Sequence, residues 1–410
     1  MKFIDDAVKR ILTVKFELGL FDDPYKYCSI EREKKLLYHK EHKAAALDMA
    51  KKSIVLLKNE GDLLPISKKQ KNIALIGALA ADKTSPLGGW RIGSDDSTAV
   101  SVQEGLAAYS KKITYAKGAD VTIGETAFIK ELTINETDKS GFDEAIALAK
   151  KSEVIIMVLG EHGFHTGEGR SRTKLGLPGV QQDLLEAVHK VNPNIILVVN
   201  SGRPLVLTWA HENIPAILEA WQLGTQSGHA IAQVLYGDYN PSGKLPMTFP
   251  RSVGQVPIYY NYYSTGRPDP IDMVFWSHYS DEKNEPLYPF GYGLSYTTFD
   301  YSKLTIDATQ QTKIKVNITL TNSGSVAGEE VVQLYIRDKV ASVVQPVKAL
   351  KGFEKVALKA GESKTITFSL TNEELGFYNT KGEFVVEPGQ FDVMVGGSSQ
   401  EGLTASFILK

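Results

Sequence analysis

Hydrophobic residues between about 31 and 255 form short continuous runs, separated by segments with helical spacing. The runs expected to be strands are 53–59, 72–77, 154–160, 195–200 and 216–221, and the clearest expected helices are 142–149, 180–191 and 227–236. Short apolar strands that alternate with helices are typical of a mainly parallel sheet covered on both faces. Ligands of such sheets bind beyond the C-terminal ends of the strands. The loops that begin at Gly77, Gly160 and Asn200 are therefore expected to line a site.

The N-terminal segment has an apolar stripe with helical spacing, followed by Gly19 as the expected C-cap. The stripe consists of Ile4, Ala7, Val8, Ile11, Val14 and Leu18. Such a stripe needs a surface to bury against, so this helix either docks on the rest of the chain or belongs to a larger domain. Acidic Asp5 and Asp6 stand where a signal peptide has basic residues, and no small-residue cleavage site follows. The segment is therefore not expected to be a signal peptide.

After about residue 299 the hydrophobic period changes to two. Apolar and polar residues alternate strictly in 314–320, 332–336, 366–370 and 391–395, with glycine-containing turns between these runs. About 110 residues of this pattern predict a two-sheet antiparallel sandwich of immunoglobulin or fibronectin III type. Residues 253–298 are rich in Pro, Gly, Tyr and Asn without a regular period, which indicates a long connection. The expected fold class is α/β followed by all-β.

The composition excludes several classes of partner. Lys and Arg total 46 against 48 Asp and Glu, a net charge of -2, so no strong field attracts nucleic acid or an anionic membrane. No apolar run approaches the roughly 18 residues that span a bilayer. The single cysteine, Cys28, leaves no internal disulfide framework. No cofactor and no metal site are expected.

The richest stretch in chemistry is 160–178, GEHGFHTGEGRSRTKLGLP, between an expected strand and an expected helix. This glycine-punctuated loop holds pairs of carboxylate, guanidinium and imidazole side chains, namely Glu161 and Glu168, Arg170 and Arg172, and His162 and His165. These groups suit proton transfer to a polar, hydroxyl-rich substrate. No second catalytic carboxylate is evident elsewhere in the sequence. We therefore interpret the loop as one half of an active site.

Several blocks of the sequence carry a family resemblance. They are FIDDAVKRILTVKFELGLFDDPY, SIVLLKNEGDLLPI, the GEH and GEGRSR pieces of the loop, NSGRPL, the segment from Glu219 to Pro257, YPFGYGLSYTTF and NSGSVAGEEVVQLYIRD. Together they resemble glycoside hydrolase family 3, in particular bacterial periplasmic β-glucosidases and β-xylosidases, and the resemblance covers essentially the whole chain. The resemblance implies a periplasmic or extracellular location.

The resemblance implies a (β/α)8-type barrel, an α/β sandwich and a fibronectin III-like domain, in that order. In this sequence it implies a terminal barrel helix and linker at 1–30, the α/β sandwich domain at 31–255, a linker at 256–298 and the fibronectin III-like domain at 299–410. The family's nucleophile is an aspartate on the barrel, which lies outside the sequence given.

The resemblance also implies roles for residues of the loop. Retaining glycosidases use one carboxylate as nucleophile and a second carboxyl group, about 5 Å away, as acid/base. Glu168 matches the family's acid/base position better than Glu161, which is the second candidate or a residue that holds the loop. Expected substrate contacts are Arg170, Arg172, His162 and Trp90. The alternatives are that the arginines anchor the loop, that His162 and His165 are structural, and that Trp90 packs.

The function expected is that of a β-glycosidase that hydrolyses terminal β-D-glucosyl or β-D-xylosyl residues with retention. Its substrate is a β-linked oligosaccharide or glycoside, and this chain alone is expected to be inactive. The exposed barrel-facing surface is expected to meet a barrel-containing chain or a second copy. One alternative is a non-catalytic carbohydrate-binding or scaffold protein. Another is a nucleotide-binding enzyme, because Gly77 and the pair Gly88 and Gly89 follow a strand. However, no phosphate-binding glycine motif stands at the strand exits, and no acidic residue for a ribose is identifiable.

Overall fold

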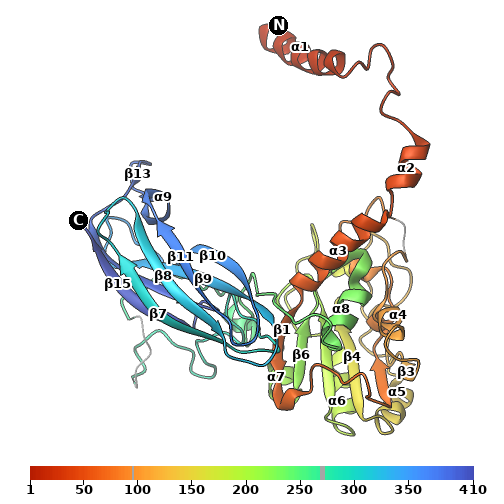
Figure 1. The fold of residues 1–410 in the computed structure, drawn as a ribbon. Helices are drawn as coiled ribbons and strands as arrows, with labels where there is room; N and C mark the ends of the chain where they lie inside the picture. The colour runs from red at the N-terminus through yellow and green to blue at the C-terminus, as the bar shows by residue number, and fades with distance from the viewer. Residues whose placement is uncertain (95–96, 268–272) are drawn as a thin grey trace. The chain divides into compact units, whose positions relative to one another are not determined.

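The computed structural model describes residues 1–94, 97–267 and 273–410, and the chain divides into two compact units, Met1–Ala45 and Ala46–Lys410 (Figure 1). The first unit contains α1 (Lys2–Glu17), α2 (Ile30–Leu36) and the first turns of α3 (Lys40–Ser53). The expected N-terminal helix is therefore present, but none of its residues is buried. Its C-cap is Leu18, and Gly19 follows with a φ of 70°.

The second unit begins with a six-stranded sheet in the order β1-β6-β5-β4-β2-β3. The strands are β1 (Val55–Asn59), β2 (Ile73–Ile76), β3 (Ile113–Ala116), β4 (Val154–Gly160), β5 (Ile195–Asn200) and β6 (Ala216–Glu219). β2 to β6 are parallel, whereas β1 pairs with β6 in the antiparallel sense at one edge. The prediction of a mainly parallel sheet is confirmed.

Helices cover both faces of this sheet (Figure 1). They are α4 (Val102–Ala107), α5 (Phe142–Ala149), α6 (Gln181–His189), α7 (Thr208–Asn213) and α8 (Ser227–Leu235). One core cluster joins the sheet to α5, α6 and α7, and the other joins it to α4, α8 and the last turn of α3. Every residue of β4 and β5 is buried. This burial on two sides explains why these strands are continuously apolar.

An antiparallel β-sandwich follows the connection. Its sheets have the orders β10-β9-β14-β15 and β11-β8-β7, and a two-stranded hairpin joins β12 to β13. The elements are β7 (Phe299–Asp307), β8 (Ile314–Asn322), β9 (Gly328–Asp338), β10 (Ala349–Leu358), β11 (Ser363–Leu370), α9 (Asn372–Leu375), β12 (Phe377–Tyr378), β13 (Phe384–Val385), β14 (Gly389–Gly396) and β15 (Leu403–Leu409). All pairs are antiparallel, and one apolar core fills the space between the two sheets. The predicted sandwich is confirmed.

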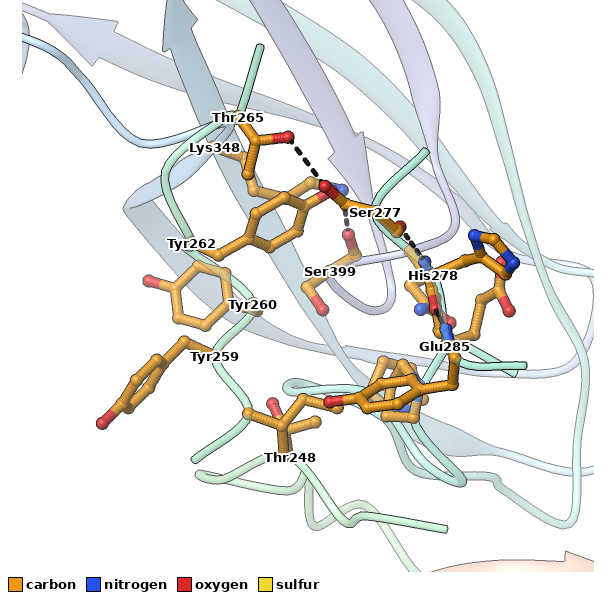
Figure 2. Close-up of a pocket in the computed structure, with 16 residues that line it drawn as sticks. Thr248, Tyr259, Tyr260, Tyr262, Thr265, Ser277, His278, Glu285, Lys348 and Ser399 are labelled. Atoms are coloured by element: carbon orange, nitrogen blue, oxygen red, sulfur yellow. Dashed lines mark hydrogen bonds between the residues drawn. The ribbon is translucent and has the colours of Figure 1, made fainter. Parts of the chain in front are cut away.

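The connection between the two domains is largely irregular, and its residues 268–272 lie outside those described. The Tyr260 ring stacks on Phe290 at 4.3 Å and meets Tyr335 of β9 edge to face at 5.8 Å. Tyr260 therefore packs the connection against the sandwich, whereas Tyr259 and Tyr262 are exposed. These three tyrosines line one side of a cavity of about 510 Å³ (Figure 2).

A buried ion pair ties the α/β domain to the sandwich. Lys244 follows α8, and its Nζ lies 2.9 Å from Oε1 of Glu330 on β9. The two side chains are only 12% and 7% exposed. Lys244 also donates to the carbonyl oxygen of Gly293, at 2.6 Å. In the part of the chain that the structure describes, no helix is both long and apolar enough to cross a membrane.

Candidate active site

The candidate site lies at the C-terminal edge of the parallel sheet, where β4 and β5 end side by side. Gly160 closes β4 with a φ of 137°, and a Cβ there would come within 2.0 Å of the Asn200 carbonyl oxygen. Only glycine fits this backbone approach. Glu161 continues the strand exit, and its N–H donates to the Asn200 carbonyl oxygen at 2.7 Å. The buried Gln181 side chain binds both the N–H and the C=O of Gly160.

Glu161 is a buried anchor of the loop. Its side chain is 0% exposed, and its Oε1 lies 2.6 Å from Arg172 Nη1 and 3.1 Å from Arg203 Nε. The Gly202 N–H donates to its second oxygen at 3.3 Å. A buried carboxylate is stable only with partners of this kind. The contacts of Glu161 are thus those of a residue that holds the loop, one of the two roles considered for it.

Arg203 contacts the loop from the turn after β5, and sequence reasoning did not select it. Besides Glu161, its guanidinium donates to the backbone carbonyl oxygens of Arg170, at 2.8 Å, and of His165. These two residues flank Glu168 at short distances along the chain. The one available sign was the position of Arg203 in NSGR, directly after a strand at the sheet edge.

Glu168 projects from the loop between two glycines with positive φ, Gly167 at 127° and Gly169 at 70°. It is exposed and lines a cavity of about 190 Å³ together with Trp90, Phe128 and Ile129. Within the described residues, Glu168 is the only carboxylate that lines this cavity. The arrangement allows a proton to pass between Glu168 and a ligand seated beside aromatic rings.

Trp90 belongs to the wall of the same cavity. It is 64% exposed, and its ring centroid lies 6.3 Å from that of Phe128. An exposed indole beside the Glu168 carboxyl group is able to stack on the apolar face of a sugar. Asp95 and Asp96, which belong to the same sequence segment, lie outside the described residues.

The guanidinium groups of the two loop arginines make hydrogen bonds within the protein. Arg170 donates to the carbonyl oxygens of Phe128, at 2.6 Å, and of Lys130, at 3.1 Å. Arg172 donates to Glu161 and to the Gly176 carbonyl oxygen, at 3.2 Å. In this structure both therefore make the contacts expected of loop anchors.

The two histidines are buried beneath the loop. His162 Nδ1 accepts a hydrogen bond from the Phe164 N–H at 3.1 Å, and His165 Nδ1 accepts one from the His162 N–H at 3.2 Å. Burial, followed by the positive charges of Arg172 and other neighbours, lowers the pKa of His165 to about 3. A pKa this low favours the neutral imidazole at physiological pH.

A third glutamate, Glu219, is a second residue that the sequence reasoning missed. It ends β6 with a fully buried side chain, and burial raises its pKa well above the ordinary value. Its Oε1 accepts from the Trp221 N–H at 2.9 Å and from Ser201 Oγ at 3.1 Å.

Among the described residues, no group of three or more His, Cys, Asp or Glu side chains is arranged to hold a metal ion.

Family models match both domains. The Glycosyl hydrolase family 3 C-terminal domain matches residues 54–296, and the Fibronectin type III-like domain matches residues 330–399.

Curated proteins and solved structures resemble the whole chain. A periplasmic β-glucosidase of Salmonella typhimurium is 40% identical over an alignment that covers 100% of this chain and 56% of that protein. A β-xylosidase of Formosa agariphila is 43% identical, with 98% and 54% covered. The crystal structure of a β-glucosidase from Listeria innocua in complex with isofagomine has a TM-score of 0.90 and 37% identity, with 99% and 55% covered.

These alignments show that the chain spans about half the length of the curated relatives it matches. The matched part contains the α/β domain, with its candidate site, and the β-sandwich. The agreement of the family models, the relatives and the fold leads to one conclusion: the chain belongs to glycoside hydrolase family 3.

Proposed function

We propose that this chain supplies the acid/base half of the active site of a β-glycosidase, with Glu168 as the acid/base. The observation that carries the proposal is the place of Glu168, exposed beside an aromatic-walled cavity at the C-terminal edge of the sheet. Glu161, the second candidate, has both oxygens engaged by guanidinium or backbone donors and no exposed surface. Glu161 therefore presents no exposed oxygen to a substrate.

The reaction proposed is the retaining hydrolysis of terminal β-D-glucosyl or β-D-xylosyl residues, a choice supported by the names of the relatives. In such reactions a nucleophile forms a glycosyl-enzyme while a carboxylic acid protonates the leaving oxygen, and the same group then deprotonates water. Glu168 takes the second role. The nucleophile comes from a barrel domain, for which the unmatched length of the relatives leaves room. The name of one relative supports a periplasmic or extracellular location.

The proposal assigns the remaining loop residues to support. Trp90 stacks on the sugar, whereas Arg170, Arg172 and His162 hold the loop and shape the approach to Glu168. The domain limits proposed are 1–30 for the barrel's terminal helix and linker, 31–255 for the α/β sandwich, 256–298 for the linker and 299–410 for the fibronectin-like part. The barrel belongs to another chain segment or to a partner, and a second copy of this chain is the other partner considered for the exposed apolar side of α1.

The test is the Glu168→Gln variant in an assembly that contains the barrel. Substrates with poor leaving groups should react roughly 10²- to 10⁴-fold more slowly, the usual contribution of general acid/base catalysis. Activated aryl glycosides need little protonation of the leaving group and should lose less in the glycosylation step. Initial rates on the two substrate types measure the difference.

Glu161→Gln is the matched control for the leaving-group dependence, because Glu161 anchors the same loop but contacts no ligand in the proposed arrangement. A loss caused by the disturbed loop should affect both substrate types alike. If this control reproduced the leaving-group dependence and Glu168→Gln did not, the acid/base assignment would move to Glu161. Equal losses on both substrate types in Glu168→Gln would argue against an acid role for Glu168.

A further inference from the structure

Two turns clamp the residues on either side of Glu168. The first follows β5: Gly202 and Arg203 bind Glu161, and Arg203 also binds the carbonyl oxygens of His165 and Arg170. The second turn follows β6, where Gln222 Nε2 donates to Thr166 Oγ1 at 3.1 Å. Residues 167–169, with Glu168 at their centre, are exposed between the residues that these two turns hold.

The clamps fit the loop closely. A Cβ at Gly202 would come within 2.4 Å of Thr166 Oγ1, so the first turn packs directly against the residue that the second turn binds. A Cβ at Gly88 would come within 2.8 Å of Gln222 Oε1, which places Gln222 against the backbone beside Trp90 as well. The two turns therefore contact the loop at Thr166 and the backbone beside Trp90, both at the small cavity of Glu168.

Glu219 joins the two turns to each other. Its Oε1 accepts from Ser201 Oγ in the first turn and from the Trp221 N–H in the second. Trp221 has a φ of 49°, a conformation that non-glycine residues rarely adopt and that needs support from its surroundings. Glu219 provides that support from below, while the indole N–H of Trp221 binds the Ser53 carbonyl oxygen at 3.1 Å.

We propose that Glu219 is a positioning residue whose buried carboxyl group couples these two turns and so sets the place of Glu168. This inference rests on the proposed function for its catalytic meaning, since Glu219 itself reaches no substrate. Its Oε2 has no hydrogen-bond partner among the described residues, and no cation is paired with it there. Burial raises the pKa of Glu219, which favours the neutral acid. Glu219 therefore couples the two turns through its acceptor oxygen Oε1 and not through a negative charge.

The test compares Glu219→Gln with Glu219→Leu by hydrogen exchange of the 163–170 backbone amides in this chain. Gln retains the acceptor oxygen and should leave exchange within about twofold of the wild type. Leu removes the acceptor from both turns and should speed exchange of these amides by about 10-fold, while amides of the sandwich core stay protected. Glu330→Gln, a buried glutamate variant in β9, is the control for general destabilisation and should leave the 163–170 amides unchanged.

Gln222→Ala keeps the test decisive if Glu219→Leu does not fold, because Gln222 is only partly buried. It should speed exchange around Thr166 by a similar factor. Unchanged exchange in Glu219→Leu, or in Gln222→Ala where the Leu variant does not fold, would overturn the inference. So would equal disturbance by Glu219→Gln and Glu219→Leu.

A second readout separates this inference from the proposed function. In an assembly with the barrel, Glu219→Leu should lower kcat on substrates with poor leaving groups roughly 10-fold with little change in KM, and Glu219→Gln should not. Faster exchange without loss of kcat would support the positioning role of Glu219 and reject the catalytic role of Glu168. Loss of kcat without faster exchange would reject the positioning role of Glu219.

Discussion

At the scale of single residues, three glutamates at the sheet edge differ in environment and therefore in what they do. Glu161 is buried between two arginines, and Glu168 is exposed. Glu219 is buried, and among the described residues no cation pairs with it. The same side chain is thus an ion-pair anchor, a structural hydrogen-bond acceptor and a candidate acid/base. Motif position pointed to Glu168, but the partners of Glu161 and Glu219 arise only when β4, β5 and β6 lie together.

His165 leads to a prediction about stability and pH. Its pKa is about 3 in the folded protein against 6.5 for an ordinary histidine, so below about pH 6.5 the unfolded chain takes up a proton that the folded chain does not. Stability should therefore fall as the pH falls from about 6.5 towards 3, with His165 contributing up to about 1.4 kcal/mol per pH unit. Guanidinium unfolding at pH 7, 6 and 5 measures this slope.

His165→Asn should flatten that slope, because Asn offers an acceptor to the His162 N–H without a group that titrates in this range. Exposed His42→Asn is the control and should retain the slope of the wild type. An unchanged slope in His165→Asn would mean that the histidine does not remain neutral in the folded state.

At the scale of elements, the sequence pattern predicted the strands that have one unbroken hydrophobic pattern. β4 and β5 were predicted with the bounds that the structure has, because they are buried on both faces and read as unbroken apolar runs. β3 was not predicted, since only one of its four residues is buried at the edge of the sheet. The same limit applies to the site: Glu168 stands in a local motif, whereas Arg203 and Gln222 reach the loop from 38 and 56 residues away.

The junction of the two domains gives a prediction at this scale. Glu330→Gln removes the charge that balances the buried Lys244 ammonium and should lower the free energy of unfolding by about 3–5 kcal/mol. The double variant Lys244→Met/Glu330→Leu removes both charges and should recover most of this loss. Recovery will be incomplete, because the Tyr301 hydroxyl loses its acceptor on Glu330.

Guanidinium titrations of the wild type, Lys244→Met, Glu330→Leu and the double variant form the complete cycle, and Glu330→Gln is measured beside them. Lys339→Met, which breaks a more exposed pair with Asp392 within the sandwich, is the control and should cost less than about 1 kcal/mol. A double variant as unstable as either single variant would show that the pair is favourable in itself, beyond the balancing of buried charge.

At the scale of the whole molecule, the proposed function requires a second domain that carries the nucleophile. The structure provides the loop, its clamps and one carboxylate at the cavity, together with a sandwich joined by buried polar contacts. α1 exposes large apolar side chains, including Phe3 at 89% and Phe16 at 73%. Exposed apolar residues in such a group are typical of a surface that meets another protein surface.

The last prediction is that this 410-residue chain by itself does not hydrolyse glycosides at a useful rate. Protonation of the leaving oxygen lowers only part of the barrier, while the nucleophile forms the covalent intermediate and stabilises the oxocarbenium charge. Without the contacts that hold the sugar between two domains, the advantage of proximity is lost as well. The rate on aryl β-glucosides and β-xylosides should therefore be at least roughly 10⁵-fold below that of an assembly with the barrel. Glu168→Ala serves as the control, since any residual rate should be the same in both. Clear turnover that disappears in Glu168→Ala would instead require a second carboxylate from this chain or from a second copy of it.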